Sequence, residues 1–182
     1  MLTIAVFPNI DKENAPMVLR RIVNFYQGKD VKLLMPMDSA KFFRYEEYGV
    51  DDIENYPIDM ALSIGGDGTL LGICRRLYER DIPVCGINIG TFGFLADIEL
   101  PELESKLEKI IKGQYYFEER MLVSGFVKSG EDDERFLGHA INDVVVTKGG
   151  VARMLHLGLS VDGCRVMDYK ADGLIVSTAT GS

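Results

Sequence analysis

The sequence has few cysteines, no long apolar run and a deficit of positive charge. Its three cysteines, Cys74, Cys85 and Cys164, are odd in number, and no two of them are at metal-ligand spacing. A reduced, cytoplasmic protein is the simplest interpretation. The apolar run at residues 2–7 is too short for the core of a signal peptide, and no apolar stretch is long enough to span a membrane.

The shortage of basic residues excludes one class of partner. There are 20 Lys and Arg against 28 Asp and Glu, which gives a net charge of -8. A general nucleic-acid binder would need a basic face, so none is expected. An anionic substrate would have to be held locally, by helix N-termini, backbone amides, a divalent metal or a few Lys and Arg. Hydrophobic residues make up 47% of the chain, so a packed core is expected.

Hydrophobic periodicity divides the chain near residue 116. Before it, apolar runs alternate with segments of helical spacing, which predicts a mostly parallel sheet. After it, helical spacing disappears and Asp162-Gly163 marks a tight hairpin. Strands are expected at 2–7, 31–35, 60–64, 84–89, 121–127, 140–147, 154–161, 164–169 and 174–177, and helices at 15–27, 69–80 and 101–111. Residues 128–135, with their acids, are expected to form an exposed loop.

The predicted fold class is an α/β domain over residues 1–116, Rossmann-like and nucleotide-binding, followed by a mostly antiparallel β domain over 117–182. The chain stops just after a predicted strand, with nothing to close the second domain. Strands without a partner would leave an exposed edge. We therefore expect the second domain to be incomplete, as in a fragment truncated at its C-terminus.

A glycine cluster, Gly65-Gly66-Asp67-Gly68-Thr69, lies between a predicted strand and a predicted helix. Glycines let backbone N–H groups approach a phosphate closely, and the helix directs its positive end to the same place. An aspartate among these donors would repel an anion unless it takes a proton or helps to hold a metal. The alternative is a tight turn in which Asp67 caps the helix. The cluster lacks the Gly-Lys-Ser/Thr of a Walker loop, and Gly-x-Gly-x-x-Gly is absent too.

Three later stretches are unusual, although each has a simple structural interpretation. Residues 88–95 (NIGTFGFL) could be a strand end and a turn with Phe94 in the core. Asn142-Asp143 could be a polar step within a strand, and residues 171–182 (ADGLIVSTATGS) could be a strand and its loop. His139 and His156 have no acids or cysteines at ligand spacing and are taken as ordinary residues.

Together these four stretches resemble the NAD kinases. Gly-Gly-Asp-Gly-Thr after a strand is also similar to diacylglycerol and sphingosine kinases and, more distantly, to phosphofructokinases. The stretches at 88–95, 140–146 and 171–182 match the NAD kinase segments Asn-x-Gly-x-x-Gly-Phe-Leu, Asn-Glu before a valine-rich strand, and Asp-Gly-Leu-x-x-Ser-Thr-Pro-Thr-Gly-Ser. The second departs by having Asp143 in place of Glu, and the third by having Ala179 in place of Pro.

The resemblance implies a role for each matching residue. Phe94 would pack against adenine, Asn142 would contact adenine through its amide, and Asp143 would contact ribose hydroxyls. Asp172 would contact the nicotinamide end, often across a subunit boundary, in a pocket lined by Thr180 and Ser182. A homodimer or homotetramer is implied, as are NAD as substrate and ATP or polyphosphate as donor.

The implied reaction is transfer of the ATP γ-phosphoryl group to the adenosine ribose 2′-hydroxyl of NAD, giving NADP. Asp67 would take the hydroxyl proton, and the backbone amides of Gly66, Gly68 and Thr69 would face phosphate oxygens. A divalent ion such as Mg²⁺ would bridge the phosphates, held mainly by phosphate and water. Arg75 or Arg76 could also approach the phosphates, and the sequence does not choose between them.

Two other functions stay open at this point. A lipid kinase of the diacylglycerol or sphingosine type shares the first motif, but it would be expected to have a basic or apolar membrane-facing surface. A dinucleotide-binding fragment that performs no catalysis would bind NAD without turnover.

Overall fold

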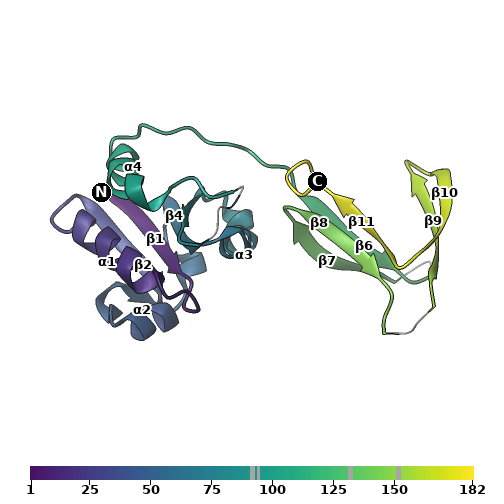
Figure 1. The fold of residues 1–182 in the computed structure, drawn as a ribbon, viewed down its shortest axis with the longest axis horizontal. Coiled ribbons are helices and arrows are strands. Elements are labelled where there is room, and N and C mark those ends of the chain that lie inside the picture. Colours follow the sequence, from purple (N-terminus) through teal and green to yellow (C-terminus); the bar gives the residue numbers. More distant parts are fainter. Residues whose placement is uncertain (91–92, 94, 131–132, 151–152) are drawn as a thin grey trace. The chain divides into compact units, whose positions relative to one another are not determined.

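The computed structural model describes residues 1–90, 93, 95–130, 133–150 and 153–182. The chain divides into two units, Met1–Glu118 and Glu119–Ser182. Unit 1 runs from purple to teal in Figure 1, and unit 2 from green to yellow.

Unit 1 is built on a five-stranded parallel sheet with the order β3-β2-β1-β4-β5. Its strands are β1 (Leu2–Pro8), β2 (Val31–Pro36), β3 (Gly49–Val50), β4 (Met60–Gly65) and β5 (Val84–Asn88). Parallel neighbours need crossover connections, and here these are mostly helices. The chain moves outward from β1 to β2 and β3 on one side, and then returns to β4 and β5 on the other. Loops at the carboxyl ends of β1 and β4 therefore flank a topological switch point, where ligands bind in sheets of this kind.

Helices cover both faces of this sheet. They are α1 (Ala15–Tyr26), α2 (Met37–Phe43), α3 (Asp67–Leu77) and α4 (Leu103–Ile111), with 3₁₀ turns at Glu46–Tyr48, Ile53–Asn55, Tyr78–Arg80 and Leu100–Glu102. Because successive strand residues point to opposite faces, Ile4 and Val6 join the core under α1 and α4, while Ala5 and Phe7 pack against α3. The strand residues are thus buried on both faces, as expected for a parallel sheet.

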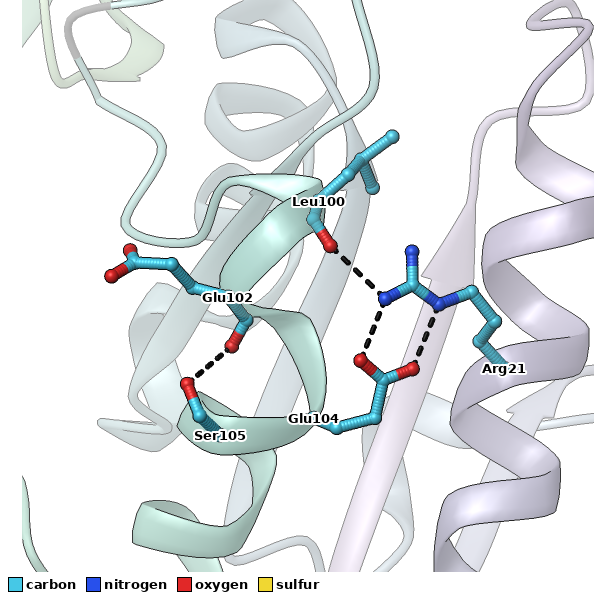
Figure 2. A network of polar contacts seen from close by, with 5 residues as sticks. All are labelled: Arg21, Leu100, Glu102, Glu104 and Ser105. Carbon is cyan, nitrogen blue, oxygen red and sulfur yellow. Dashed lines mark hydrogen bonds and ion pairs between the residues drawn. The ribbon is translucent and has the colours of Figure 1, made fainter.

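Arg21 joins the two helices that cover the first face (Figure 2). Its guanidinium on α1 donates to both carboxylate oxygens of Glu104 on α4, at 2.8 and 2.6 Å, and to the Leu100 carbonyl at 3.0 Å. Ser105 donates to the Glu102 carbonyl at 2.8 Å at the start of the same helix. The paired geometry fixes α4 against α1, although both charged side chains remain partly exposed.

The described residues of unit 2 form three two-stranded antiparallel ladders. Their strands are β6 (Val123–Lys128), β7 (Glu134–Ala140), β8 (Asp143–Thr147), β9 (Leu155–Val161), β10 (Cys164–Ala171) and β11 (Gly173–Ser177). β6 pairs with β7, β8 with β11, and β9 with β10. The predicted hairpin at Asp162-Gly163 is confirmed, because both residues have positive φ, 50° and 77°, and connect β9 to β10.

The predicted fold class is confirmed, whereas several predicted element bounds are wrong. α3 begins at Asp67 rather than at residue 69, because Gly66 takes the extended conformation of a helix cap and leaves Asp67 in the first turn. Residues 134–140 form β7, although their charged start had indicated a loop; Glu134 pairs with Lys128 at the exposed end of the ladder. None of the helices in the described ranges has the length and apolar character needed to cross a bilayer.

Candidate active site

The first glycine turn connects β4 to α3. A Cβ on Gly65 would lie 2.3 Å from the Thr69 Oγ1, which is closer than packed atoms come, so only glycine fits there. The Thr69 N–H donates to the Gly66 carbonyl at 3.0 Å, inside the first turn of the helix. The amide of Thr69 is therefore used by the helix itself, and its hydroxyl is the group that can contact a ligand.

A second glycine turn, which contains Gly90 and Gly93, follows β5. The Asp67 carboxylate extends from the first glycine turn to this second turn. Its Oδ1 accepts a hydrogen bond from the Leu95 N–H at 3.2 Å. A Cβ on Gly93 would lie 2.3 Å from the same oxygen, so the second turn passes directly beside the carboxylate. Asp67 is the first residue within α3, and the cap position belongs to Gly66. The alternative in which Asp67 is the cap residue is therefore wrong.

Asn88 holds the second glycine turn against the first. It is only 4% exposed, at the end of β5. Its Oδ1 accepts the Gly90 N–H at 3.1 Å, and its Nδ2 donates to Glu99 at 3.3 Å. The Ile89 N–H donates to the Gly65 carbonyl at 3.1 Å, which joins the two turns directly. Asn88 is the first residue of the motif at residues 88–95, but the motif predicted no role for it. Phe94, the predicted adenine contact, lies outside the described residues.

A groove of about 510 Å³ opens on another side of the first turn. It is lined by Phe7, Pro8, Asn9, Pro36, Asp38, Ser39, Gly68, Thr69, Gly72, Ile73 and Arg76. The Asn9 side-chain amide donates to the Thr69 Oγ1 at 2.9 Å and so ties the end of β1 to α3. No role was predicted for Asn9, although its position directly after the first strand is a signal that could have indicated one. A second groove, of about 380 Å³, is lined by residues at the start of α1 and at the end of α2. None of the predicted site residues lines it.

Arg76 is the arginine of the 75–76 pair that reaches this groove. Its Nε donates to Glu54 at 2.8 Å, and its Nη2 contacts the same carboxylate oxygen. The guanidinium lies 5.4 Å from the centre of the Phe7 ring. Hydrogen bonding from Arg76 keeps the pKa of the Glu54 carboxyl below its usual value. The ion pair thus holds a guanidinium at the edge of the groove.

In unit 2, the loop after β11 folds back onto Asn142. Thr178 is 4% exposed; its N–H donates to the Asn142 carbonyl at 2.8 Å, and its hydroxyl donates to the Ile141 carbonyl. The same hydroxyl accepts the N–H groups of Thr180 and Gly181 at 3.2 and 3.3 Å. This buried threonine organises the loop, a role that its sequence motif did not predict.

Most of the predicted site residues of unit 2 lie at one end of it, around Asn142. The Asn142 Oδ1 is buried, with no hydrogen-bond partner among the described residues. Asp143 is next to it and pairs with Ser177 in the β8–β11 ladder. Thr180 accepts a hydrogen bond from Arg120 at 3.2 Å, and Ser182, the last residue, is exposed.

Asp172 lies at the other end of the β8–β11 ladder, where Gly173 pairs with Thr147. Four residue steps along a strand separate the two ends by about 13 Å. The Asp172 carboxylate accepts a hydrogen bond from the Lys148 ammonium at 2.6 Å, and its carbonyl accepts the Lys148 N–H at 3.1 Å. Asp172 and Asn142 are therefore not brought together.

Comparison with known proteins identifies the family. The profile described as "ATP-NAD kinase N-terminal domain" matches residues 3–115, and the one described as "ATP-NAD kinase C-terminal domain" matches residues 141–182. The chain belongs to the NAD kinase family. Both units contribute to this match, so membership does not depend on the glycine turn alone.

Individual relatives agree with the profiles. An NAD kinase from Moorella thermoacetica is 38% identical over 182 residues, which is all of this chain and 58% of that protein. Among solved structures, yeast NADH kinase complexed with NADH superposes with a TM-score of 0.86 at 20% identity, and an NAD kinase from Archaeoglobus fulgidus in complex with ATP with 0.67 at 25%. The chain is covered completely in both and spans 58% and 62% of their lengths. The yeast match shows a shared fold.

Proposed function

We propose that the chain is part of an NAD kinase that transfers the γ-phosphoryl group of ATP, or a phosphoryl group of polyphosphate, to the adenosine ribose 2′-hydroxyl of NAD. The observation that carries this proposal is the Asp67 carboxylate beside the second glycine turn. The Asp67 carboxylate lies in a glycine turn of the kind that binds phosphate, and it also reaches the loop that contains Gly93 and Leu95. That is the arrangement needed to take a proton from an acceptor while phosphate is held nearby.

The chemistry follows from this position. The ribose 2′-oxygen forms a bond to the γ-phosphorus as the bond from that phosphorus to the β–γ bridging oxygen breaks, and ADP leaves. Asp67 takes the 2′-hydroxyl proton as the new bond forms. Backbone N–H groups at Gly66 and Gly68, together with the α3 N-terminus, face the phosphate charge.

Magnesium enters this scheme with the nucleotide. Within the parts of the chain that the structure describes, no three His, Cys, Asp or Glu side chains form a group that could hold a metal. Mg²⁺ keeps several waters and binds through one or two carboxylates plus substrate phosphates. The Asp67 carboxylate fits an ion that arrives as part of MgATP.

Unit 2 supplies the proposed contacts to NAD. The buried Asn142 Oδ1 is a hydrogen-bond acceptor that an adenine amino group could satisfy, with Asp143 on the ribose. The proposed role of Phe94, packing against adenine, belongs to unit 1. Asp172, held by Lys148, would contact the nicotinamide end. Thr180 and Ser182 would contact the ligand from the Asn142 end of the β8–β11 ladder, and not beside Asp172 as the resemblance implied. A homodimer or homotetramer in the cytoplasm completes the proposal.

The decisive experiment replaces Asp67 by Asn in the complete protein. The amide oxygen of Asn can still accept the Leu95 N–H, so the turn keeps its geometry while the base is lost. We expect kcat for NADP formation to fall about 10²- to 10⁴-fold, while NAD binding by calorimetry changes less than about twofold. Asp81→Asn removes the same charge at an exposed position with a φ of 53°, which Asn adopts readily, and serves as control.

The same measurements separate the rival functions. Unchanged kcat in Asp67→Asn would rule out the general-base role. NAD binding without turnover in the wild-type protein would favour a dinucleotide-binding module that performs no catalysis. Matches to the family profile in both units do not favour a lipid kinase.

A further inference from the structure

The groove beside Thr69 lies where the sheet topology favours ligand binding. It is formed at the carboxyl end of β1, between the start of α2 after β2 and the start of α3 after β4. β1 is the central strand from which the connections diverge, so the two helix starts face each other across its end. A volume of about 510 Å³ is within the range of small-molecule sites.

One side of the groove suits phosphates. Gly68 and Gly72 expose the backbone of α3, and no atom lies within 4 Å of where their Cβ atoms would be. Arg76 lies two turns into the same helix, with its guanidinium held by Glu54 and 46% of its side chain exposed. A phosphate chain along α3 would meet the helix N-terminus and then a guanidinium that can exchange a carboxylate oxygen for a phosphate oxygen.

The other side of the groove suits hydroxyl groups and disfavours phosphates. Asp38 and Ser39 are in the first turn of α2 and line the groove with Pro36. A carboxylate accepts hydrogen bonds from sugar hydroxyls, whereas it repels an anion. The groove therefore has a cationic side and an anionic side, which matches a ligand with a charged phosphate chain at one end and a neutral, hydroxyl-bearing group at the other.

We propose that this groove binds the phosphoryl donor and selects a nucleoside triphosphate over inorganic polyphosphate, with Arg76 on the phosphates and Asp38 on the ribose hydroxyls. The inference rests on the proposed function and specifies its donor. Linear polyphosphate is charged along its whole length, so it would place phosphate against the Asp38 carboxylate. The acceptor lies on the side of the first glycine turn where Asp67 reaches the second turn, and the donor lies on the side where Thr69 meets Asn9.

The test compares MgATP with polyphosphate as donor for the complete protein at saturating NAD. We expect wild-type protein to prefer ATP in kcat/KM. Asp38→Ala should lower kcat/KM for ATP about 10-fold or more, as loss of one charge-assisted hydrogen bond does, and should raise that for polyphosphate. Asp51→Ala removes an exposed carboxylate that does not line the groove and should leave the ratio of the two within about twofold.

A second pair of variants tests the phosphate side. Arg76→Gln should weaken binding of a non-hydrolysable ATP analogue about 10-fold or more, measured by calorimetry without NAD. Arg75→Gln removes the same charge from the adjacent exposed residue, which does not line the groove, and should leave binding within about twofold. The KM for NAD should be unchanged in both.

Three results would overturn the proposal: wild-type protein that prefers polyphosphate, an Asp38→Ala donor ratio equal to that of wild type, or equal effects of Arg75→Gln and Arg76→Gln. Binding of the analogue is measured without turnover. If no NADP forms from either donor, the proposed function fails, and the calorimetry still decides whether the groove takes a nucleoside triphosphate.

Discussion

Replacing Gly93 by Ala tests the position of the proposed base without changing its chemistry. The added Cβ would lie 2.3 Å from the Asp67 Oδ1 and 2.8 Å from its Cγ. Real Cβ contacts are not found below 3.0 Å, so the oxygen or the turn must move by at least about 0.7 Å, which is 3.0 minus 2.3. The Leu95 N–H bond to the same oxygen is already 3.2 Å long and would be lost or redirected.

A shift of this size is large for a proton acceptor. Misplacement of a reacting group by about 1 Å can cost about 100-fold in rate. We therefore expect Gly93→Ala to lower kcat about 10- to 100-fold, with the KM for ATP little changed. The assay is initial-rate NADP formation by the complete protein, with thermal unfolding measured in parallel to show that the variant is folded.

Gly90→Ala is the matched control, because it adds the same methyl group near the same turn with nothing within 4 Å of it. Its kcat should stay within about twofold of wild type. A Gly93→Ala variant with wild-type kcat would show that the carboxylate does not need its present position. An equal loss in both variants would show that the turn, and not Asp67, is what the substitution disturbs.

Three further predictions concern unit 2, acid stability and thiol reactivity. Gly181→Ala places a Cβ 2.4 Å from the backbone carbonyl oxygen of Asn142, which cannot rotate away. The KM for NAD should therefore rise about 10-fold or more, while the KM for ATP should not change. Equal KM values for NAD in variant and wild type would contradict this prediction. Hydrogen bonding from Arg21 lowers the pKa of the Glu104 carboxyl. The ion pair therefore stabilises the folded state, by at most about 1 kcal/mol at this partly exposed site. This stabilisation is present above the ordinary pKa of 4.5 and is lost as pH falls through the lowered pKa. Urea unfolding should therefore show Glu104→Gln less stable than wild type at pH 7 and equal to it near pH 2, and a gap that persists in acid would refute the reasoning. Burial raises the pKa of the Cys85 thiol to about 12, so iodoacetamide at pH 8 should label the exposed Cys164 first, as peptide mass spectrometry would show.

Local patterns in the sequence were sufficient for much of the fold. Alternating apolar strands and helices gave the parallel sheet of unit 1, and Asp162-Gly163 gave the hairpin, because positive φ at both positions is a property of those two residues. β7 was missed because its formation depends on pairing with β6, and its own residues begin with a charged pair. The first glycine turn could be located in the same way, since a Cβ on Gly65 would meet Thr69, only four residues away.

The sequence by itself determined which residues are chemically suited to the proposed reaction: a carboxylate among glycines, an amide before a valine-rich strand, and a polar loop after the last strand. Only the tertiary structure decided what these groups contact. Asp67 meets Leu95 across 28 residues and Asn9 meets Thr69 across 60, and Arg76 rather than Arg75 reaches the groove. The physical reason is that sequence periodicity reports contacts a few residues apart, whereas a site at the end of a parallel sheet is assembled from loops that the strand order brings together.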